Sequence, residues 1–211
     1  MDEKIELVIF DMDGVLVDVI SSWAWVHEHF DVDNDDSYKA YKDGEIDDME
    51  FIRRDIELWK SAKEDISKDD VLDILKEIPL ITGYYDTIPE ISEKYRTAII
   101  SGGLKPLAEY IGSDYFDKIM ANDLEEEDGK LTGEGLLEVR LKDKGEAMER
   151  LLSELEIKKE NTAAVGNSHT DSPMLEKAAL GIAFNPSDER VKKAADKVIK
   201  KKDLTLLLKK L

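Results

Sequence analysis

The sequence contains no cysteine. Disulfide bonds, thiolate metal sites and a cysteine nucleophile are therefore excluded, and this absence fits a reducing compartment. Glycine and proline are also scarce, with 12 and 5 residues in a chain of 211. Together with a hydrophobic fraction of 42%, this scarcity indicates an ordered globular protein. A chain of this length can bury a full core and also hold an insertion.

Long apolar runs are missing as well. No stretch reaches the ~18 residues that a membrane-spanning helix needs. Asp2, Glu3 and Glu6 crowd the N-terminus, where a secretory signal would carry positive charge. We therefore expect a soluble, cytoplasmic protein.

Positive charge is in deficit. The chain has 30 Lys and Arg residues against 49 Asp and Glu residues, which gives a net charge of -19. Nucleic acid and anionic membranes are thus disfavoured as partners, because both are bound by neutralising phosphates with Lys and Arg. A small anionic substrate remains compatible if a metal ion and a few local cations reverse the field inside a site.

The most informative stretch that is present is a buried strand ending in two carboxylates. Residues 7–10 are apolar and rich in β-branched side chains, which is typical of a strand buried on both faces of a parallel sheet. Asp11 and Asp13 follow directly, and Gly14 lets the chain turn away. Ligands of open α/β sheets bind beyond the carboxyl ends of the strands, so we expect metal ligation and acid–base or nucleophilic chemistry here. A surface Asp-x-Asp-Gly turn is the alternative, but it does not explain the apolar strand.

Residues 18–79 carry apolar side chains at helical spacing and no strand pattern. We predict that they form a small all-helical cap inserted into an α/β core made of residues 1–17 and 80–211. His27 and His29 lie two residues apart, on different faces of a helix, so we do not expect them to share a metal ion. Four aromatic residues of this region are expected to pack in a small bundle or to line a pocket; they are Trp23, Trp25, Phe30 and Trp59.

The rest of the chain alternates strands with helices. Strand patterns occur at 97–100, 118–121, 162–166, 180–184 and 197–199, and a hairpin is expected around Asp128-Gly129. Helices are expected at 89–95, 105–111, 142–155, from about 173, at 188–195 and from 203. Lys144 stands at a helix start, where the macrodipole disfavours a cation, so we expect its side chain to point at a negative group. The alternation predicts an α/β fold, with a Rossmann-like parallel sheet covered by helices on both faces.

Polar groups recur at the ends of these strands and at the starts of these helices, and the motifs that contain them resemble the haloacid dehalogenase superfamily, specifically its phosphoserine-phosphatase-like branch. The resemblance rests on Phe-Asp-Met-Asp-Gly-Val-Leu-Val at 10–17, Ile-Ile-Ser-Gly-Gly at 99–103, Asp-Gly-Lys-Leu-Thr-Gly at 128–133, Lys-Gly-Glu at 144–146 and Val-Gly-Asn-Ser-His-Thr-Asp-Ser-Pro-Met-Leu at 165–175.

This resemblance implies a Mg2+-dependent phosphomonoester hydrolase that acts through an aspartyl-phosphate. It implies that Asp11 is the nucleophile and that Asp13 is the general acid and base. Substrate phosphoryl oxygens would be held by Ser101, the Gly102 amide and Lys144. Mg2+ would be bound at Asp11, the Asp13 carbonyl, Asn167 and Asp171, the last of which would also orient Lys144.

Three positions depart from the family pattern, one at the metal site and two at the substrate site. Asn167 stands where the family normally has Asp, so the metal would bind with one negative charge fewer. Ile20 and Ile56 stand where phosphoserine-specific members are expected to carry a Glu and an Arg. Arg53 and Arg54 are nearby substitutes. A more apolar phosphomonoester would suit a pocket lined by Ile20, Trp23 and Trp25.

Alternative functions follow from the same residues. A phosphotransferase of the same fold would pass the phosphoryl group to another hydroxyl, and the sequence does not separate it from a hydrolase. Asn167 also motivates a weakly active protein that binds a phosphorylated ligand. A nicotinamide-binding fold is disfavoured, because no Gly-x-Gly-x-x-Gly follows a strand. No pattern indicates an oligomeric state.

Overall fold

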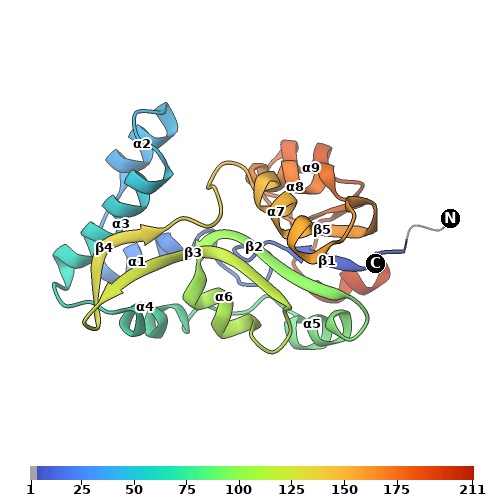
Figure 1. Ribbon diagram of the computed structural model, residues 1–211, viewed down its shortest axis with the longest axis horizontal. Helices are drawn as coiled ribbons and strands as arrows, with labels where there is room; N and C mark the ends of the chain where they lie inside the picture. The colour runs from blue at the N-terminus through green and yellow to red at the C-terminus, as the bar shows by residue number, and fades with distance from the viewer. Residues whose placement is uncertain (1–3) are drawn as a thin grey trace.

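The computed structural model describes residues 4–211, so residues 1–3 of the predicted core lie outside the described part. Within these residues, seven strands form one sheet in the order β4-β3-β2-β1-β5-β6-β7 (Figure 1). All neighbouring strands are parallel except β3 and β4, which form the predicted hairpin. The strands are β1 (Leu7–Phe10), β2 (Arg96–Leu104), β3 (Lys118–Glu127), β4 (Lys130–Leu136), β5 (Thr162–Gly166), β6 (Leu180–Phe184) and β7 (Lys197–Ile199).

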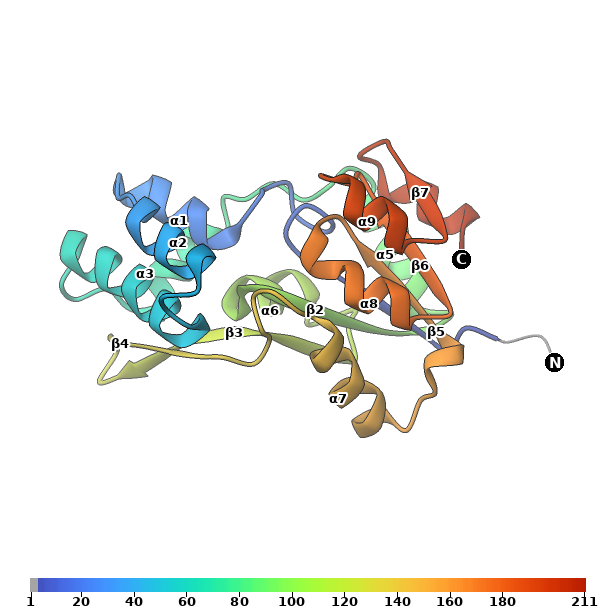
Figure 2. The same cartoon turned by 90° about the horizontal axis from the view of Figure 1, so that it is seen from above.

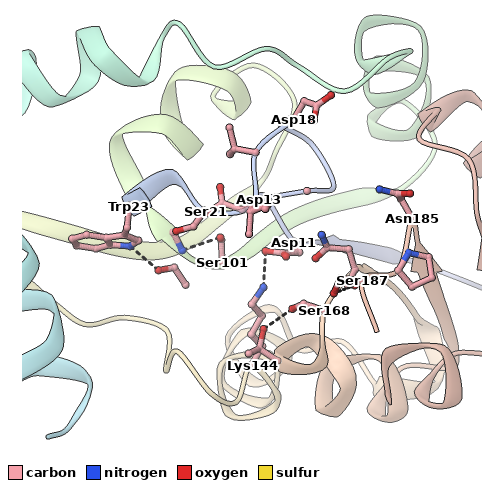
Figure 3. Close-up of a pocket in the computed structure, with 18 of the residues that line it drawn as sticks. Asp11, Asp13, Asp18, Ser21, Trp23, Ser101, Lys144, Ser168, Asn185 and Ser187 are labelled. Carbon is pink, nitrogen blue, oxygen red and sulfur yellow. Dashed lines mark hydrogen bonds and ion pairs between the residues drawn. The ribbon is translucent and has the colours of Figure 1, made fainter. Parts of the chain in front are cut away.

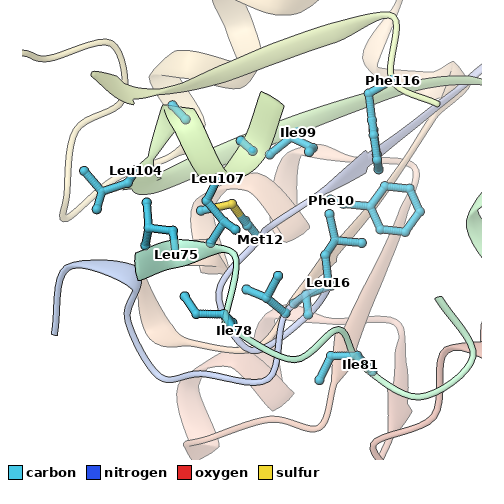
Figure 4. Packing of buried hydrophobic residues seen from close by; sticks show 14 of the residues in the cluster. Phe10, Met12, Leu16, Leu75, Ile78, Ile81, Ile99, Leu104, Leu107 and Phe116 are labelled. Carbon is cyan, nitrogen blue, oxygen red and sulfur yellow. The ribbon is translucent and has the colours of Figure 1, made fainter. Parts of the chain in front are cut away.

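Helices cover both faces of the sheet, which confirms the predicted α/β class. Side chains of β1 alternate between two core clusters, because successive residues of a strand point to opposite faces. One cluster joins Phe10 to α5 (Tyr84–Ser92) and α6 (Lys105–Gly112), and Figure 4 shows its packing around Phe10, Met12 and Leu107. The other joins Ile9 to α7 (Gly145–Leu155), α8 (Ser172–Lys177) and α9 (Glu189–Ala194).

Four helices lie between β1 and α5, where the cap is predicted. They are α1 (Ser22–Phe30), α2 (Asp35–Asp43), α3 (Asp48–Ala62) and α4 (Lys68–Leu75). Figures 1 and 2 show α1, α2 and α3 beside the β3–β4 hairpin, at the opposite end of the long axis from α8 and α9. The hairpin is tied to this region by Leu131, whose N–H donates to the Ile66 carbonyl at 2.8 Å. The division into domains at residues 17 and 80 stays a prediction.

Two segments connect these four helices to the sheet, and they run side by side. Val17 and Leu80 form an isolated antiparallel bridge. The Asp18 N–H donates to the Pro79 carbonyl at 2.7 Å, and the Ile81 N–H donates to the Leu16 carbonyl at 2.9 Å. The helical region is therefore attached through a short two-stranded link.

Some helix boundaries differ from the sequence-based expectation. Helix α5 begins at Tyr84 instead of Pro89, because Gly83 adopts a left-handed conformation with φ 82° and accepts the Thr87 N–H. Pro89 lies inside this helix, where it leaves the Tyr85 carbonyl without its usual donor; Tyr85 is exposed, so water can take that place. The segment after Asp203 is a 3-10 helix, Leu204–Lys209. None of the helices within residues 4–211 is long and apolar enough to cross a bilayer.

Candidate active site

A cavity of about 580 Å³ opens beyond the carboxyl ends of β1, β2 and β5. It brings together five of the predicted side chains from four separate stretches of the chain; they are Asp11, Asp13, Ser101, Lys144 and Asn167. Gly102 lines the same cavity. Figure 3 shows Asp11 and Lys144 pointing toward each other at its floor.

Lys144 lies between two buried carboxylates. Its Nζ is 2.5 Å from Asp11 Oδ1 and 2.6 Å from Asp171 Oδ1. Burial alone would lower the pKa of Lys144, but the two carboxylates raise it above its usual value, so the side chain stays charged. The prediction that Lys144 points at a negative group is confirmed. The cation offsets charge that would otherwise be buried without a partner.

Burial raises the pKa of Asp11 to about 7, and the neighbouring Asp171 carboxylate adds to this effect while Lys144 opposes it. Asp11 is 4% exposed, and one of its oxygens accepts the Met12 N–H at 2.6 Å. Burial makes the ionised form of this carboxyl unfavourable, and a further positive charge beside it would stabilise that form. Its position at the end of β1 therefore favours a metal ion or a reaction that uses its negative charge.

Asp13 is held by the start of α1. Its Oδ2 accepts hydrogen bonds from the Ser22 N–H at 2.8 Å and the Ser22 hydroxyl at 3.0 Å. Its Oδ1 is buried and has no hydrogen-bond partner within the described residues. Burial raises the pKa of Asp13 to about 6, although the Ser22 hydrogen bonds act in the opposite direction. A carboxyl with this pKa can both give and take a proton near neutral pH.

The glycines after Ser101 allow three elements to meet closely. A Cβ on Gly103 would lie 2.6 Å from Ser22 Oγ and 2.7 Å from the end of the Met12 side chain. Ser101 is buried, and its hydroxyl accepts the Gly103 N–H at 3.0 Å. The Gly102 carbonyl accepts the Trp23 indole N–H at 3.1 Å, so α1 is tied to this turn. β2 runs on to Leu104, four residues past the predicted strand end.

Asp171 organises the loop that follows β5. Its Oδ2 accepts the backbone N–H groups of Asn167 and Ser168, each at 2.9 Å. Asn167 lies against Gly14, where φ is 77° and an added Cβ would be 2.0 Å from the Asn167 side-chain nitrogen. The loops after β1 and β5 are therefore in direct contact, as a shared ligand site requires.

The donor set of this cluster fits a hard divalent cation. Within residues 4–211, no three His, Cys, Asp or Glu side chains are grouped to hold a metal by themselves. The predicted metal ligands do not depend on such a group, because they include the Asn167 side chain and a backbone carbonyl. All of the predicted donor atoms are oxygens, which suit a hard cation. The orphaned Asp13 Oδ1 beside Asp11 is a further oxygen without a compensating charge.

Several other predicted residues lie elsewhere. Trp25 does not line the cavity, because its indole N–H donates to the Ile74 carbonyl at 3.1 Å. Arg53 and Arg54 are both paired with Glu50 on α3, away from the cavity. Trp23 does line it, stacked on Trp59 with ring centroids 5.3 Å apart.

The two positions where the chain departs from the phosphoserine-specific pattern differ in their exposure. Ile20 lies at the mouth of the cavity and is 98% exposed. Ile56 is fully buried in the core and does not line the cavity.

Two residues that shape the site were not predicted, namely Lys202 at the cavity and the buried Ser22 that holds Asp13. Lys202 lines the cavity and pairs with Asp18, which joins the segment before the last 3-10 helix to the loop after β1. Lys202 stands in a lysine-rich stretch, 200–202, and no local pattern distinguishes it from its neighbours. Ser22 was also missed, although a Ser-Ser pair before an apolar helical pattern is a known helix-start signal.

Comparison with known proteins gives consistent matches. The family model described as haloacid dehalogenase-like hydrolase matches residues 108–205. A phosphoserine phosphatase from Methanocaldococcus jannaschii is 33% identical over 220 residues, covering 99% of both chains. A phosphoserine phosphatase from Haemophilus influenzae is 30% identical, covering 96% of this chain and 64% of its own length. A substrate-bound phosphoserine phosphatase structure superposes with a TM-score of 0.79 at 30% identity over 99% of both chains.

Proposed function

The chain belongs to the haloacid dehalogenase-like hydrolases, in their phosphoserine-phosphatase-like branch, and on this premise we propose how its residues divide the reaction. It is a phosphatase that hydrolyses a small phosphomonoester. Enzymes of this branch use a divalent metal ion and typically form an aspartyl-phosphate. The observation that carries the proposal is the contact of Asp11 with Lys144 beside Asp13, at the carboxyl end of the central strand.

In the first step Asp11 attacks phosphorus, and the bond from phosphorus to the substrate oxygen breaks. Lys144 and the amide of Gly102 face the phosphoryl oxygens, and the Ser101 hydroxyl lies beside them. These groups stabilise charge on the transferring group without having to move during the reaction. Asp171 holds Lys144 in place through the ion pair at 2.6 Å.

Asp13 supplies the proton that the leaving oxygen needs. Its pKa of about 6 lets it be protonated when the substrate binds and ionised when the acyl phosphate must be hydrolysed. As a carboxylate it then takes a proton from the attacking water, which releases inorganic phosphate and restores Asp11. The two hydrogen bonds from Ser22 keep the carboxyl in position throughout.

Mg2+ is the metal that suits this all-oxygen donor set. Asp11, the Asp13 carbonyl and Asn167 would hold it, with Asp171 behind them. When bound, it supplies positive charge that offsets the phosphoryl oxygens in a protein whose net charge is -19.

The curated relatives act on phosphoserine, which makes phosphoserine one candidate substrate. The described cavity presents Ile20 and Trp23, however, while Arg53 and Arg54 lie outside it. An amino acid carboxylate thus lacks an arginine partner here. A phosphomonoester without a carboxylate fits the lining better.

The test is release of inorganic phosphate from an aryl phosphate, measured with EDTA and then with added Mg2+. We expect metal-dependent turnover that falls by about 10^3-fold or more in Asp11→Asn. Asp114→Asn changes an exposed carboxylate that does not line the cavity, and this matched control should keep full activity. An added alcohol acceptor separates hydrolysis from transfer, because a phosphotransferase would yield the phosphorylated alcohol. Absence of turnover at high Mg2+ by a folded protein would overturn the proposal.

A further inference from the structure

A second cavity, of about 220 Å³, lies within the helical region beside the first. The two cavities share Ser21, Trp23 and Leu141 as walls. The remaining lining of the second cavity comes from α1, α2 and α3 and from the residue before α2; it consists mainly of Ala24, His27, Asn34, Tyr38, Phe51, Ile52 and Asp55. One acidic side chain thus faces an enclosure that includes the aromatic rings of Trp23, Tyr38 and Phe51.

Asp55 carries the acidic group, and it has no cation partner. It is 2% exposed. Its Oδ1 accepts a hydrogen bond from the Asn34 side-chain amide at 2.9 Å and lies 3.4 Å from His27 Nε2. Within residues 4–211, no Lys or Arg nitrogen lies within 4.0 Å of this carboxylate. A buried carboxylate without a cation is costly, which calls for a compensating group.

His27 does not supply that charge. The Trp59 indole N–H donates to His27 Nδ1 at 2.6 Å, and an indole nitrogen can only donate. Nδ1 must therefore be the unprotonated nitrogen, and the hydrogen-bond network assigns the single ring proton to Nε2. With a single ring proton the imidazole is neutral, and its buried Nε2 has no hydrogen-bond partner among residues 4–211. The cavity thus presents an uncompensated carboxylate and an unused N–H donor.

We propose that this second cavity binds a primary ammonium group, carried by the substrate on the end remote from its phosphate. Asp55 takes the cation, and His27 Nε2 donates to an oxygen atom next to it when the ligand has one. The faces of Trp23, Tyr38 and Phe51 suit a cation as well, because aromatic rings attract positive charge. The volume equals that of about seven liquid waters, enough for a short aminoalkyl chain.

The alternative is a purely structural role for Asp55. The carboxylate links α3 to Asn34, the residue before α2, and that contact would help to hold the two helices together. This role explains the hydrogen bond to Asn34. It does not explain why a buried charge faces an open cavity without a cation, next to the site of phosphate chemistry.

The substrate preference is tested with ω-aminoalkyl phosphates of two to six carbons, each compared with the n-alkyl phosphate of equal length. This comparison of substrates rests on the proposed phosphatase function, so turnover of an aryl phosphate is measured in parallel. For the best chain length, we expect kcat/KM at least tenfold higher for the amine. Asp55→Asn should bring the two substrates to within about twofold of each other while aryl phosphate turnover is kept.

Glu57→Gln is the matched control. It also converts a carboxylate of α3 to an amide, but Glu57 pairs with Arg53 outside the cavity, so the amine preference should be unchanged. Tyr38→Leu is the second variant, because Tyr38 is 54% exposed and its replacement should not disturb folding. It should lower the amine preference by severalfold.

A binding measurement without turnover separates the two proposals. Trp23 and Trp59 lie at or next to the cavity, so n-butylamine should quench tryptophan fluorescence saturably in the wild type and in Glu57→Gln, but not in Asp55→Asn. Aryl phosphate hydrolysis without amine preference at any length, and without amine binding, would overturn the ammonium site alone. Amine binding without aryl phosphate hydrolysis would instead overturn the phosphatase proposal.

Discussion

Position 167 decides how much negative charge surrounds the proposed metal. Asn167 lies against Gly14 and lines the cavity, and we propose that its side-chain oxygen ligates the metal. Asn167→Asp should lower the Mg2+ concentration for half-maximal activity about tenfold, since a carboxylate binds a hard cation more tightly than an amide oxygen. Titration of aryl phosphate turnover with Mg2+ measures this. Asn185→Asp adds the same charge at the cavity rim and should shift the midpoint much less. Equal shifts in both variants would contradict ligation by residue 167.

Asp13 should make stability depend on pH in the metal-free protein. Its pKa rises from 3.8 to about 6 on folding, so between these values the folded protein binds more protons than the unfolded chain. The stability given by the protonated carboxyl is complete below pH 3.8 and is lost as the pH rises through 6. Asp13→Asn keeps a neutral group at every pH. In EDTA we expect this variant to be more stable than wild type by about 3 kcal/mol at pH 8, and equal to it near pH 4. Denaturant melts at both values measure the difference, and a gain that persists at pH 4 would contradict the assignment.

At the scale of elements, the β3–β4 hairpin and helix α3 meet at a glycine. A Cβ on Gly135 would lie 2.2 Å from Ile52 Cγ2. Gly135→Ala should therefore lower the free energy of unfolding by about 1–3 kcal/mol, because an overpacked contact forces the backbone to shift. Urea unfolding provides the measurement, and Glu134→Ala on the same strand should cost much less. Adding Ile52→Ala removes the clash, so the two losses should sum to more than the loss of the double variant. If the losses in unfolding free energy of the two single variants were additive, residues 135 and 52 would not be in direct contact.

The elements that the sequence predicts best are those whose burial is continuous. Residues 162–166 and 180–184 form strands with the predicted bounds, because strands buried on both faces carry unbroken apolar runs. Helix α2 lies within the predicted helical region, but its own bounds were not predicted, because its residues are mostly polar and charged. Tyr41 of this helix stacks on Phe51 of α3, with ring centroids 4.8 Å apart, and a local pattern does not contain that contact.

In the candidate site, too, the residues that follow from local patterns were predicted, and a residue that depends on tertiary packing was not. Asp11, Ser101, Lys144 and Asn167 stand at the ends or starts of predicted elements, so the topology of a parallel sheet is enough to bring them together. Lys202 reaches the same cavity from the segment after β7. Its position depends on how the final segment packs, for which the sequence carries no short-range signal.

At the scale of the whole molecule, the net charge of -19 should make stability depend on ionic strength. Repulsion among excess carboxylates disfavours the compact state, and salt screens it. The ion pairs on the surface weaken too, but exposed pairs contribute little. Raising KCl from 10 to 500 mM should therefore raise Tm by about 4 °C. Choline chloride should act equally, which excludes a specific potassium site. A fall in Tm would show that surface ion pairs outweigh the repulsion.

The central place of β1 has a consequence for how the protein is made. β1 is paired on one side with β2 and on the other with β5, where Leu7 is in register with Thr162. A ribosome adding roughly 5–20 residues per second needs about eight to thirty seconds between these two residues. During that interval one edge of the nascent β1, with its row of Leu, Val, Ile and Phe, has no native neighbour, so this is the period in which a chaperone would protect the emerging polypeptide.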